Sequence, residues 1–378
     1  MARTIIGVND AKSVKRYAGL LAYDQSQKSY FDQRFTGRGE HAEVPFQILT
    51  DLESDAGEAI SYDLLAEMTM APVEGEDNLE GKEEAQKFYT DTIYIDQARC
   101  GVNTGGRMTR KRTLHNLREK ARFQQSSWWA RLRDEIRFIY LSGARGVNAN
   151  FLLPLGYSGR ANNGLVAPDA DHLLYGGDAT AKNNVTNEAP GSAGSDAFDL
   201  RLIDRAKTRA DSQGGGSSGK LVLKPCKIDG EEAYVCVMHT FQEDDIRQST
   251  ATGQWLDIQK AAAAALGSKS PIFKGSLGMY RGVILHSHRN VIRFSDYGSG
   301  ANLAAARALF MGAQAGVEAY GSPGTGLRFD WNEETRDNGD KVVITSSCIW
   351  GTKKVTATTA AGAQDLGVFA LDTYAAVR

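Results

Sequence analysis

The chain has 378 residues, which is enough for two domains or for one core with large extensions. Its formal net charge is −2, so no overall basic field attracts nucleic acid, and any such attraction must be local. No segment reaches the roughly 20 apolar residues that span a bilayer, and the first residues lack the apolar core of a signal peptide. We therefore expect no membrane partner.

The cysteines are scattered and include no C-x-x-C pair, whereas disulfide frameworks and metal clusters need closer or more regular spacing. We expect reduced, partly buried thiols, a cytosolic place of synthesis, and neither a metal nor a cofactor. The four positions are Cys100, Cys226, Cys236 and Cys348.

Charge is sorted into two neighbouring blocks of opposite sign. Residues 51–96 contain 14 acidic residues and 2 lysines, whereas residues 107–145 contain 11 Lys or Arg and 3 acidic residues. Neighbouring fields of opposite sign steer association and fix register. The acidic block of one copy is therefore predicted to lie on the basic block of another copy, which points to self-assembly.

The first part of the chain predicts an N-terminal arm followed by a long hairpin. Residues 10–35 favour one or two short helices, and Val44–Thr50 favours a strand. Two extended segments, Ala59–Ala71 and Phe88–Ala98, flank a polar turn region at 74–84. Such a hairpin has little core of its own and needs a partner surface.

The strongest predicted helix follows the hairpin. It spans about 30 residues, or roughly 45 Å, with Thr113 as its N-cap and Gly143 and Gly146 at its end. This length suits a spine better than a compact domain. The apolar residues that recur at helical spacing are Leu114, Leu117, Ala121, Trp128, Leu132, Ile136 and Ile139.

The remainder alternates loops with helices and strands. Residues 146–219 are rich in Gly and Asn, with exposed loops expected at 183–195 and 213–219. The predicted helices are Asp196–Ala210, Gln254–Leu266 ending at Gly267, and Asn302–Tyr320 ending at Gly321. The predicted strands are Lys220–Pro225, Glu232–His239 after the turn Asp229–Gly230, Gly282–His286, Lys341–Trp350 and Leu366–Tyr374.

Three motifs suggest chemistry only weakly. Residues 214–220 nearly spell a phosphate-binding loop, but Leu221 replaces the hydroxyl residue that holds magnesium. His286 and His288 share one face of a strand, a spacing that metal sites use, although polar packing at a strand end is favoured. The segment 169–172 suggests a cation loop but lacks the glycine and the distal glutamate of an EF-hand. No catalytic residue is predicted.

The basic helix admits a second interpretation. Trp128, Trp129, Arg131 and Arg133 are residue types that contact bases and phosphates. Pairing with the adjacent acidic block is favoured over nucleic-acid binding, and a helix with arginines on several faces can do both.

Several segments carry a family resemblance in their order and combination. They are Asn78–Ala85, Phe88–Gln97, Gly106–Thr113, Met279–His288 and Ala305–Ala315. Together they resemble the major capsid proteins of tailed bacteriophages, in the branch typified by the N-four-like short-tailed phages.

The resemblance implies an α+β protein with the HK97-type phage capsid fold. That fold has an N-terminal arm, an E-loop hairpin that reaches over a neighbouring subunit, a peripheral domain with a long spine helix, and an axial domain. The implied divisions are an arm at 1–43, the E-loop at 44–106, the spine helix at 107–148, the axial domain at 149–335 with a Gly/Asn-rich insertion at about 150–215, and C-terminal peripheral strands at 336–378.

The implied function is a structural one: hexamers and pentamers in the icosahedral head of a virion around double-stranded DNA. Portal, scaffold and decoration proteins are the implied partners, and the host cytoplasm is the implied place of synthesis. Some members of the family crosslink through a lysine and an asparagine; Lys82 and Lys87 lie on the loop, but we expect non-covalent assembly.

The residues expected to act in assembly lie in the two charge blocks. The predicted intersubunit residues of the E-loop are Glu74, Glu76, Asp77, Glu80, Glu83 and Glu84. The predicted intersubunit or DNA-facing residues of the spine are Arg107, Arg110, Lys111, Arg112, Arg118, Arg122, Arg131 and Arg133. The alternatives are a nucleic-acid-binding protein that uses the helix 107–145 and, less favoured, a metal-dependent enzyme that uses His286 and His288.

Overall fold

The computed structural model describes residues 11–39, 43–53, 57–65, 68, 70–192, 194–214, 221–228, 231–249, 278–322, 328–359 and 362–378. Its helices are α1 (Ala11–Lys28), α2 (Arg107–Arg112), α3 (Leu117–Ser142), α4 (Leu200–Ser212) and α5 (Thr240–Gln248), with short 3₁₀ helices at Asp51–Glu53 and Lys182–Asn184. None of these helices is long and apolar enough to cross a membrane.

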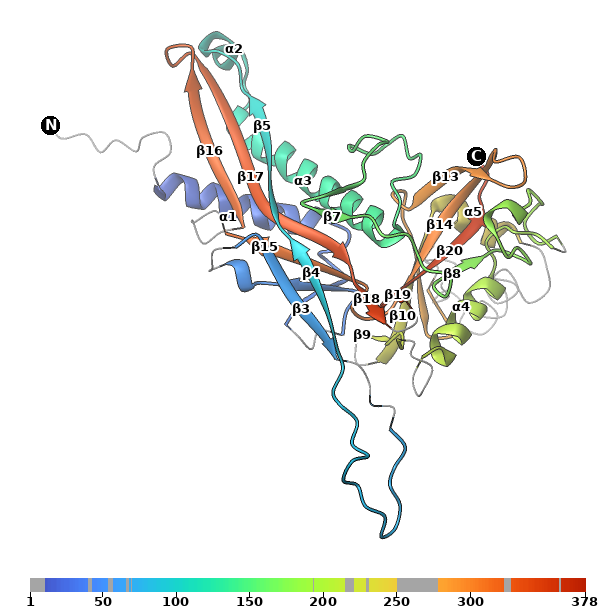
Figure 1. The fold of residues 1–378 in the computed structure, drawn as a ribbon. Coiled ribbons are helices and arrows are strands. Elements are labelled where there is room, and N and C mark those ends of the chain that lie inside the picture. Colours follow the sequence, from blue (N-terminus) through green and yellow to red (C-terminus); the bar gives the residue numbers. More distant parts are fainter. Residues whose placement is uncertain are drawn as a thin grey trace, which may run out of the picture.

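The strands of the described residues form two main sheets (Figure 1). The first sheet has the order β1-β2-β15-β17-β16, with β5 also paired to β17. Its strands are β1 (Thr36–Arg38), β2 (Phe46–Leu49), β5 (Asp96–Asn103), β15 (Gly316–Gly321), β16 (Phe329–Arg336) and β17 (Lys341–Lys354).

The second sheet has the order β11-β12-β10-β14-β20-β8, with β13 paired to β14 and β9 paired to β10. Its strands are β8 (Leu173–Tyr175), β9 (Cys226–Ile228), β10 (Glu231–Met238), β11 (Met279–Tyr280), β12 (Val283–Ser287), β13 (Ile292–Tyr297), β14 (Leu303–Met311) and β20 (Val368–Tyr374).

Three two-stranded ribbons complete the strands that the structure describes. They are β3 (Ala59–Leu65) with β4 (Phe88–Tyr94), β6 (Gly159–Arg160) with β7 (Asn163–Gly164), and β18 (Thr356–Thr359) with β19 (Gly362–Asp365).

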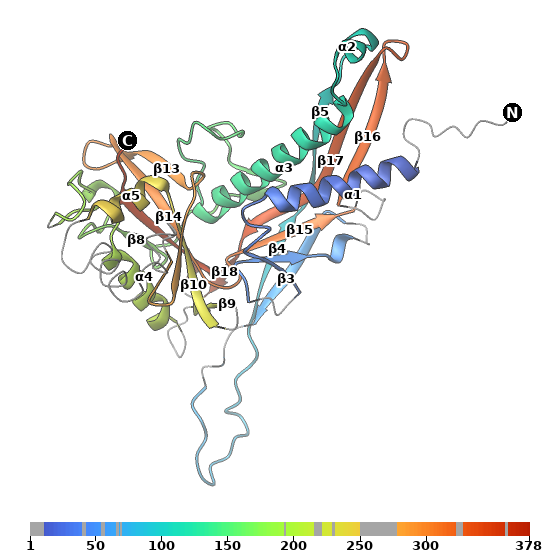
Figure 2. The same cartoon turned by 180° about the vertical axis from the view of Figure 1, so that it is seen from behind.

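Helix α3 joins the two sheets because it packs into both cores. Trp129 and Ile136 lie in a cluster with Trp331 and Trp350 of the first sheet. Near the end of the helix, Phe138, Ile139 and Leu141 pack with Val235, Leu309 and Met311 of the second sheet. Figure 2 shows α1 and α3 lying together on one face of the first sheet. The spine is therefore the element that fixes the two sheets relative to each other.

The end of α3 agrees with the sequence prediction, but its start does not. Gly143 caps the helix with φ 69°, and its N–H donates to the carbonyl oxygen of Tyr140. A Cβ at Gly143 would lie 2.2 Å from the carbonyl oxygen of Val166, so glycine is required there. The predicted N-cap, Thr113, instead ends α2, and α3 begins after Asn116 as a helix of 26 residues, about 39 Å long.

The predicted helix Asn302–Tyr320 is wrong, because that segment forms β14 and β15. Side chains of β14 alternate between two cores: Ala308 and Phe310 pack on one face, and Leu309 and Met311 on the other. A strand buried on both faces shows a continuous apolar run rather than alternation. The run of small apolar residues therefore resembled a buried helix.

Other predictions had mixed outcomes. The predicted strand Lys220–Pro225 is wrong over its described residues, 221–225, which have no regular structure before β9. The expected helix Gln254–Leu266, the turn Asp229–Gly230 and most of the near-phosphate loop lie outside the described residues. Helix α4 and the strands predicted around 44–50, 232–239, 282–286, 341–350 and 366–374 are confirmed. The four cysteines are free thiols, as predicted.

The predicted boundary at 335/336, between the axial domain and the C-terminal peripheral strands, does not coincide with a division between the two sheets. β15 and β16, from the segment assigned to the axial domain, pair with β17 in the first sheet. β20, from the segment assigned to the peripheral domain, pairs with β14 in the second sheet. The chain thus passes between the two sheets more than once. The stretch 150–215 also contributes to a core, because α4 packs on the second sheet.

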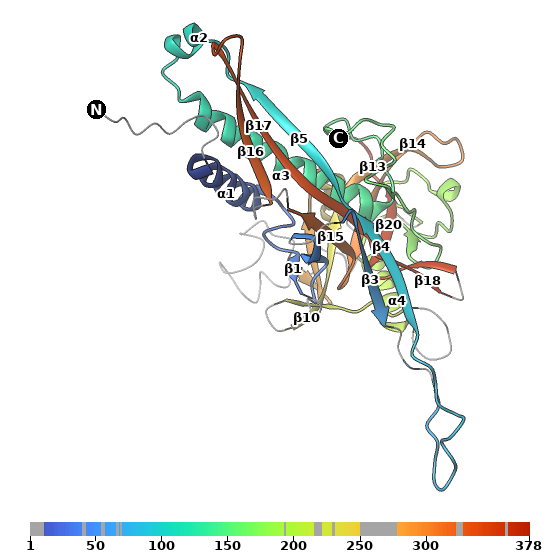
Figure 3. The same ribbon diagram turned by 60° about the vertical axis from the view of Figure 1, so that its left-hand side comes forward.

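The hairpin of β3 and β4 leaves the body at one end and continues as a long loop, of which residues 70–87 have no helix or strand. We call residues 70–87 the hairpin loop. Figure 3 shows it extending far from both sheets. The hairpin base is held in a small cluster in which Ile60 and Ile93 pack on Val317 and Val355. The loop beyond the base has no core.

A buried ionic network joins α1, α3 and the first sheet. Arg133 donates from Nη1 to Asp32 Oδ2 at 2.9 Å and from Nη2 to Glu318 Oε2 at 2.9 Å. Arg137, one turn later, donates to the same two carboxylates. Arg133, Arg137 and Glu318 are at most 3% exposed. Buried charges are tolerated only when they are paired in this way.

The network shifts the ionisation of its carboxylates. Burial alone would raise the pKa of Asp32 and of Glu318, but the two guanidinium groups outweigh burial and lower both pKa values. Both groups are therefore ionised in the folded protein at neutral pH.

We predict that Glu318→Gln lowers the free energy of unfolding by about 3 to 5 kcal/mol, because it removes one of the two carboxylates that both buried guanidinium groups share. Urea unfolding of unassembled protein measures this change. The control is Glu334→Gln, which removes an exposed partner of Arg336 and should cost less than about 1 kcal/mol. Equal losses in the two variants would contradict a structural role for the network.

Candidate assembly surfaces

The hairpin loop carries the predicted acidic residues, and these fall into two groups. Glu84 accepts a hydrogen bond from the backbone N–H of Met70 at 2.8 Å and pairs with Lys87 at 3.3 Å. Asp77 and Glu83 also have partners inside the loop. By contrast, the exposed side chains of Glu74, Glu76 and Glu80 have no hydrogen bond or ion pair among the residues described. Internal contacts therefore shape the loop and leave three carboxylates available.

Apolar side chains are also exposed along the hairpin and its loop. The residues concerned, with their exposed fractions, are Leu65 (65%), Met68 (73%), Leu79 (51%) and Phe88 (57%). Single exposed apolar residues are common, but four on one thin projection offer contact area to another surface.

The hairpin is firmly attached to the body. Lys353 of β17 forms an ion pair with Asp91 and donates to the carbonyl oxygen of Thr92 at 3.1 Å. Tyr62 Oη donates to the other carboxylate oxygen of Asp91 at 2.9 Å. These contacts connect β3, β4 and β17, so the direction in which the loop projects is set by the first sheet.

The basic block of the sequence is divided between two places. Four of its predicted residues lie on α2, beside the tip of the β16–β17 hairpin (Figure 1). Arg110 donates from Nη2 to the carbonyl oxygen of Asp340 at 2.8 Å, which anchors α2 there. The side chains of Arg107, Lys111 and Arg112 are exposed.

The four predicted arginines of α3 are paired within the chain, and for Arg133 the expectation of a neighbour- or DNA-facing role is wrong. Arg133 is buried in the network with Asp32 and Glu318. The other three form ion pairs with residues outside the acidic block: Arg118 with Glu333, Arg122 with Asp24, and Arg131 with Glu135. Helix periodicity showed which positions are apolar, but not which carboxylates would meet the arginines between them.

Comparisons with known proteins identify the family. A family model described as phage capsid protein matches residues 5–377. The chain belongs to the phage capsid protein family. The major capsid protein of Pseudomonas phage KPP25 is 25% identical over 356 residues, which is 88% of this chain and 86% of that protein.

Two solved capsid structures extend this relationship. The capsid of Ralstonia phage GP4 is 47% identical, covers 100% of this chain and 99% of its own, and has a TM-score of 0.79. The cyanophage Pam1 capsid is 20% identical, covers 93% of this chain and 94% of its own, and has a TM-score of 0.68. The chain thus has the HK97-type α+β fold of a tailed-phage major capsid protein. It is a structural subunit of a virion and assembles into a multimeric shell.

The nucleic-acid interpretation of the tryptophans is not supported in this capsid protein. Trp129 is fully buried, and its Nε1 donates to Ser346 Oγ at 2.8 Å. Trp128 packs edge-on against it, with ring centroids 5.0 Å apart. These indoles join α3 to the first sheet and do not form a platform for bases.

The two histidines of the suspected metal site are packed against aromatic rings. His288 stacks on Phe138 at 5.0 Å and lies 4.6 Å from Tyr30, and its Nδ1 accepts from the backbone N–H of Asn290. His286 lies edge-on to Phe35. Among the described residues no cluster of three His, Cys, Asp or Glu side chains is placed to hold a metal.

The suspected cation loop at 169–172 is a structural turn. Asp169 accepts hydrogen bonds from His172 Nδ1 at 2.8 Å and from the backbone N–H of Asp365 at 2.9 Å. Burial alone would raise the pKa of Asp169, but these bonds lower it to about 2. The carboxylate links the turn to β19.

Buried histidines should make the capsid subunit sensitive to acid. Burial, together with nearby arginines, lowers the pKa of His239 and of His288 to about 4. An unfolded histidine has a pKa of about 6.5, so below that pH the unfolded state binds more protons than the folded state. The free energy of unfolding should therefore fall as the pH decreases from about 6.5 to about 4.

We predict that His239→Asn flattens this pH dependence. His239 is the N-cap of α5 and accepts from the backbone N–H of Phe241 at 3.1 Å, and asparagine can cap without titrating. Urea unfolding at a series of pH values measures the slope, with the exposed His115→Asn as control. The same slope in wild type and His239→Asn would contradict the prediction.

Proposed function

We propose that hexamers and pentamers of this capsid protein form an icosahedral head around double-stranded DNA, with the hairpin loop of each copy docked on a neighbouring copy. The observation that most supports this proposal is that the loop extends away from the body and exposes both apolar side chains and unpaired carboxylates. The loop beyond the hairpin base has no core of its own, so contact with another subunit would stabilise it.

The charges favour α2 of a neighbour as part of the docking surface. Arg107, Lys111 and Arg112 are exposed there, next to one another on a short helix. In Figures 1 and 2 this helix and the hairpin loop lie at opposite ends of the subunit. A loop therefore cannot reach α2 of its own chain. Pairing of the acidic and basic groups requires a second copy, and repetition of this contact would sum weak interactions around a ring.

We extend this proposal to the DNA inside the head and to the proteins that bind the head. Exposed basic side chains on an inner face would offset part of the phosphate charge of packaged DNA without reading its sequence. On the family resemblance we propose portal, scaffold and decoration proteins as partners and the host cytoplasm as the place of synthesis. Free cysteines are consistent with a reducing cytoplasm.

We predict that the triple variant Glu74→Lys, Glu76→Lys, Glu80→Lys blocks shell formation at low salt and leaves the subunit folded. These carboxylates have no partner among the described residues, so reversal removes intersubunit attraction without breaking a contact of the fold. Negative-stain microscopy and sedimentation measure assembly, and circular dichroism measures folding.

A matched control reverses three exposed acidic residues outside the hairpin: Asp178→Lys, Glu188→Lys and Glu232→Lys. This variant has the same net charge and should still form shells. Normal shells from the loop variant would refute loop docking, and failure of both variants would indicate an effect of net charge alone.

We further predict that a charge swap restores assembly. Adding Arg107→Glu, Lys111→Glu and Arg112→Glu to the loop variant recreates attraction with the signs exchanged, whereas the three α2 changes alone should block assembly. The yield of shells from the combined variant is the measurement. If the combined variant assembles no better than either triple variant, α2 is not the surface that receives the loop.

A further inference from the structure

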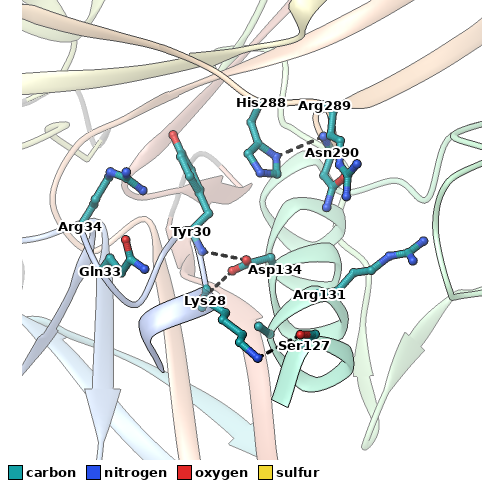
Figure 4. A pocket seen from close by; sticks show the side chains of 12 residues that line it. Lys28, Tyr30, Gln33, Arg34, Ser127, Arg131, Asp134, His288, Arg289 and Asn290 are labelled. Carbon is teal, nitrogen blue, oxygen red and sulfur yellow. Dashed lines mark hydrogen bonds between the residues drawn. The ribbon is translucent and has the colours of Figure 1, made fainter. Parts of the chain in front are cut away.

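A pocket of about 480 Å³ lies where the end of α1, the middle of α3 and the turn after β12 meet (Figure 4). Figure 4 shows Arg34 and Arg289 on opposite sides of the Tyr30 and His288 rings. The lining residues are Lys28, Ser29, Tyr30, Gln33, Arg34, Ser127, Ala130, Arg131, Asp134, His288, Arg289 and Asn290.

The cations of this pocket are poorly neutralised. Arg34 lies over the Tyr30 ring at 5.4 Å, and neither Arg34 nor Arg289 has a side-chain hydrogen bond or ion pair among the described residues. Lys28 donates to the hydroxyls of Ser126 and Ser127, at 2.6 and 3.0 Å, and to a carbonyl oxygen. Both arginines are exposed, so a ligand could approach them.

The one carboxylate in the lining does not balance these charges. Asp134 accepts from Ser29 Oγ at 2.7 Å and from the backbone N–H of Tyr30 at 2.8 Å, and it lies 3.6 Å from Arg137. Arg131 is already paired with Glu135. The pocket therefore has a net positive charge from Lys28, Arg34 and Arg289. Consistent with this, Arg289 and Arg34 add to burial in lowering the pKa of His288.

We propose that this pocket binds a phosphate group, which in the assembled head is a backbone phosphate of the packaged DNA. The second half of this inference rests on the proposed enclosure of double-stranded DNA. It would place the face that carries α1 and α3 toward the interior of the shell.

The chemistry of the lining favours phosphate over an acidic side chain. A phosphate presents oxygens in several directions and can accept from Arg34 or Arg289 together with neutral donors of the lining such as Gln33. A carboxylate presents two oxygens in a single plane and so reaches donors in fewer directions. The hairpin loop of another copy would also bring Leu79, whereas Ala130 is the only aliphatic side chain in the lining.

The test measures binding of a short labelled DNA duplex to unassembled capsid protein by fluorescence anisotropy at several salt concentrations. The test variant is Arg34→Gln with Arg289→Gln. The control is Arg336→Gln with Lys341→Gln, which removes the same charge from exposed ion pairs near the β16–β17 tip. Inorganic phosphate and a synthetic peptide of residues 70–88 serve as competitors.

We expect the test variant to bind the duplex about tenfold more weakly, with a log–log salt slope shallower by about 1, while the control stays within about twofold of wild type. Inorganic phosphate should displace the duplex from wild type. Equal losses of duplex affinity in the two variants would overturn the assignment of this pocket as the binding site, because they would indicate only a general electrostatic attraction. Displacement by the peptide at lower concentration than by phosphate would identify an acidic segment as the ligand.

Binding of inorganic phosphate without binding of the duplex would overturn the assignment to DNA. Microscopy of the same preparations separates this proposal from the proposed function. If wild-type protein forms shells but binds neither phosphate nor the duplex, the phosphate-binding proposal is refuted and the proposed function still stands. If wild-type protein never assembles, the proposed head is refuted.

Discussion

The pairing of Arg133 and Arg137 with Asp32 and Glu318 is the interaction on which the subunit's frame depends. One guanidinium lies a helical turn from the other on α3, and both contact carboxylates that come from the segment after α1 and from β15. Because such charges are expensive to bury singly, loss of any one of the four groups would disfavour the close packing of the three elements. The network therefore fixes where α1, α3 and the first sheet lie.

The rigid frame also holds the base of the projecting hairpin. β15 supplies Glu318 to the network and Val317 to the cluster that holds the hairpin base. The same strand thus links the buried charges to the place where β3 and β4 leave the body. A loop on such a base can point in a defined direction without a core of its own, which is what docking on a neighbour would require.

The sequence predicted the parts of this arrangement that depend on local pattern. Apolar spacing identified α3, Gly143 marked its end, and alternation identified the hairpin strands. It could not identify β14, because a strand buried on both faces loses its alternation and its alanines favour a helix. Nor could it pair Arg133 with Glu318, which lies 185 residues away in the chain. The contrast of acidic and basic blocks predicted self-assembly, and the family resemblance predicted the class of protein. The predicted arginines of α3 are paired within the subunit, and the exposed Arg107, Lys111 and Arg112 of α2 are left for the proposed contact.

We propose that the hairpin loop is an intersubunit element built on this frame. A cryo-electron microscopy map of assembled shells would show the path of residues 70–87. We expect the loop to lie on an adjacent subunit, with Glu74, Glu76 and Glu80 near that subunit's α2. A loop that folds back on its own subunit, or that extends into solvent without touching a neighbour, would refute loop docking.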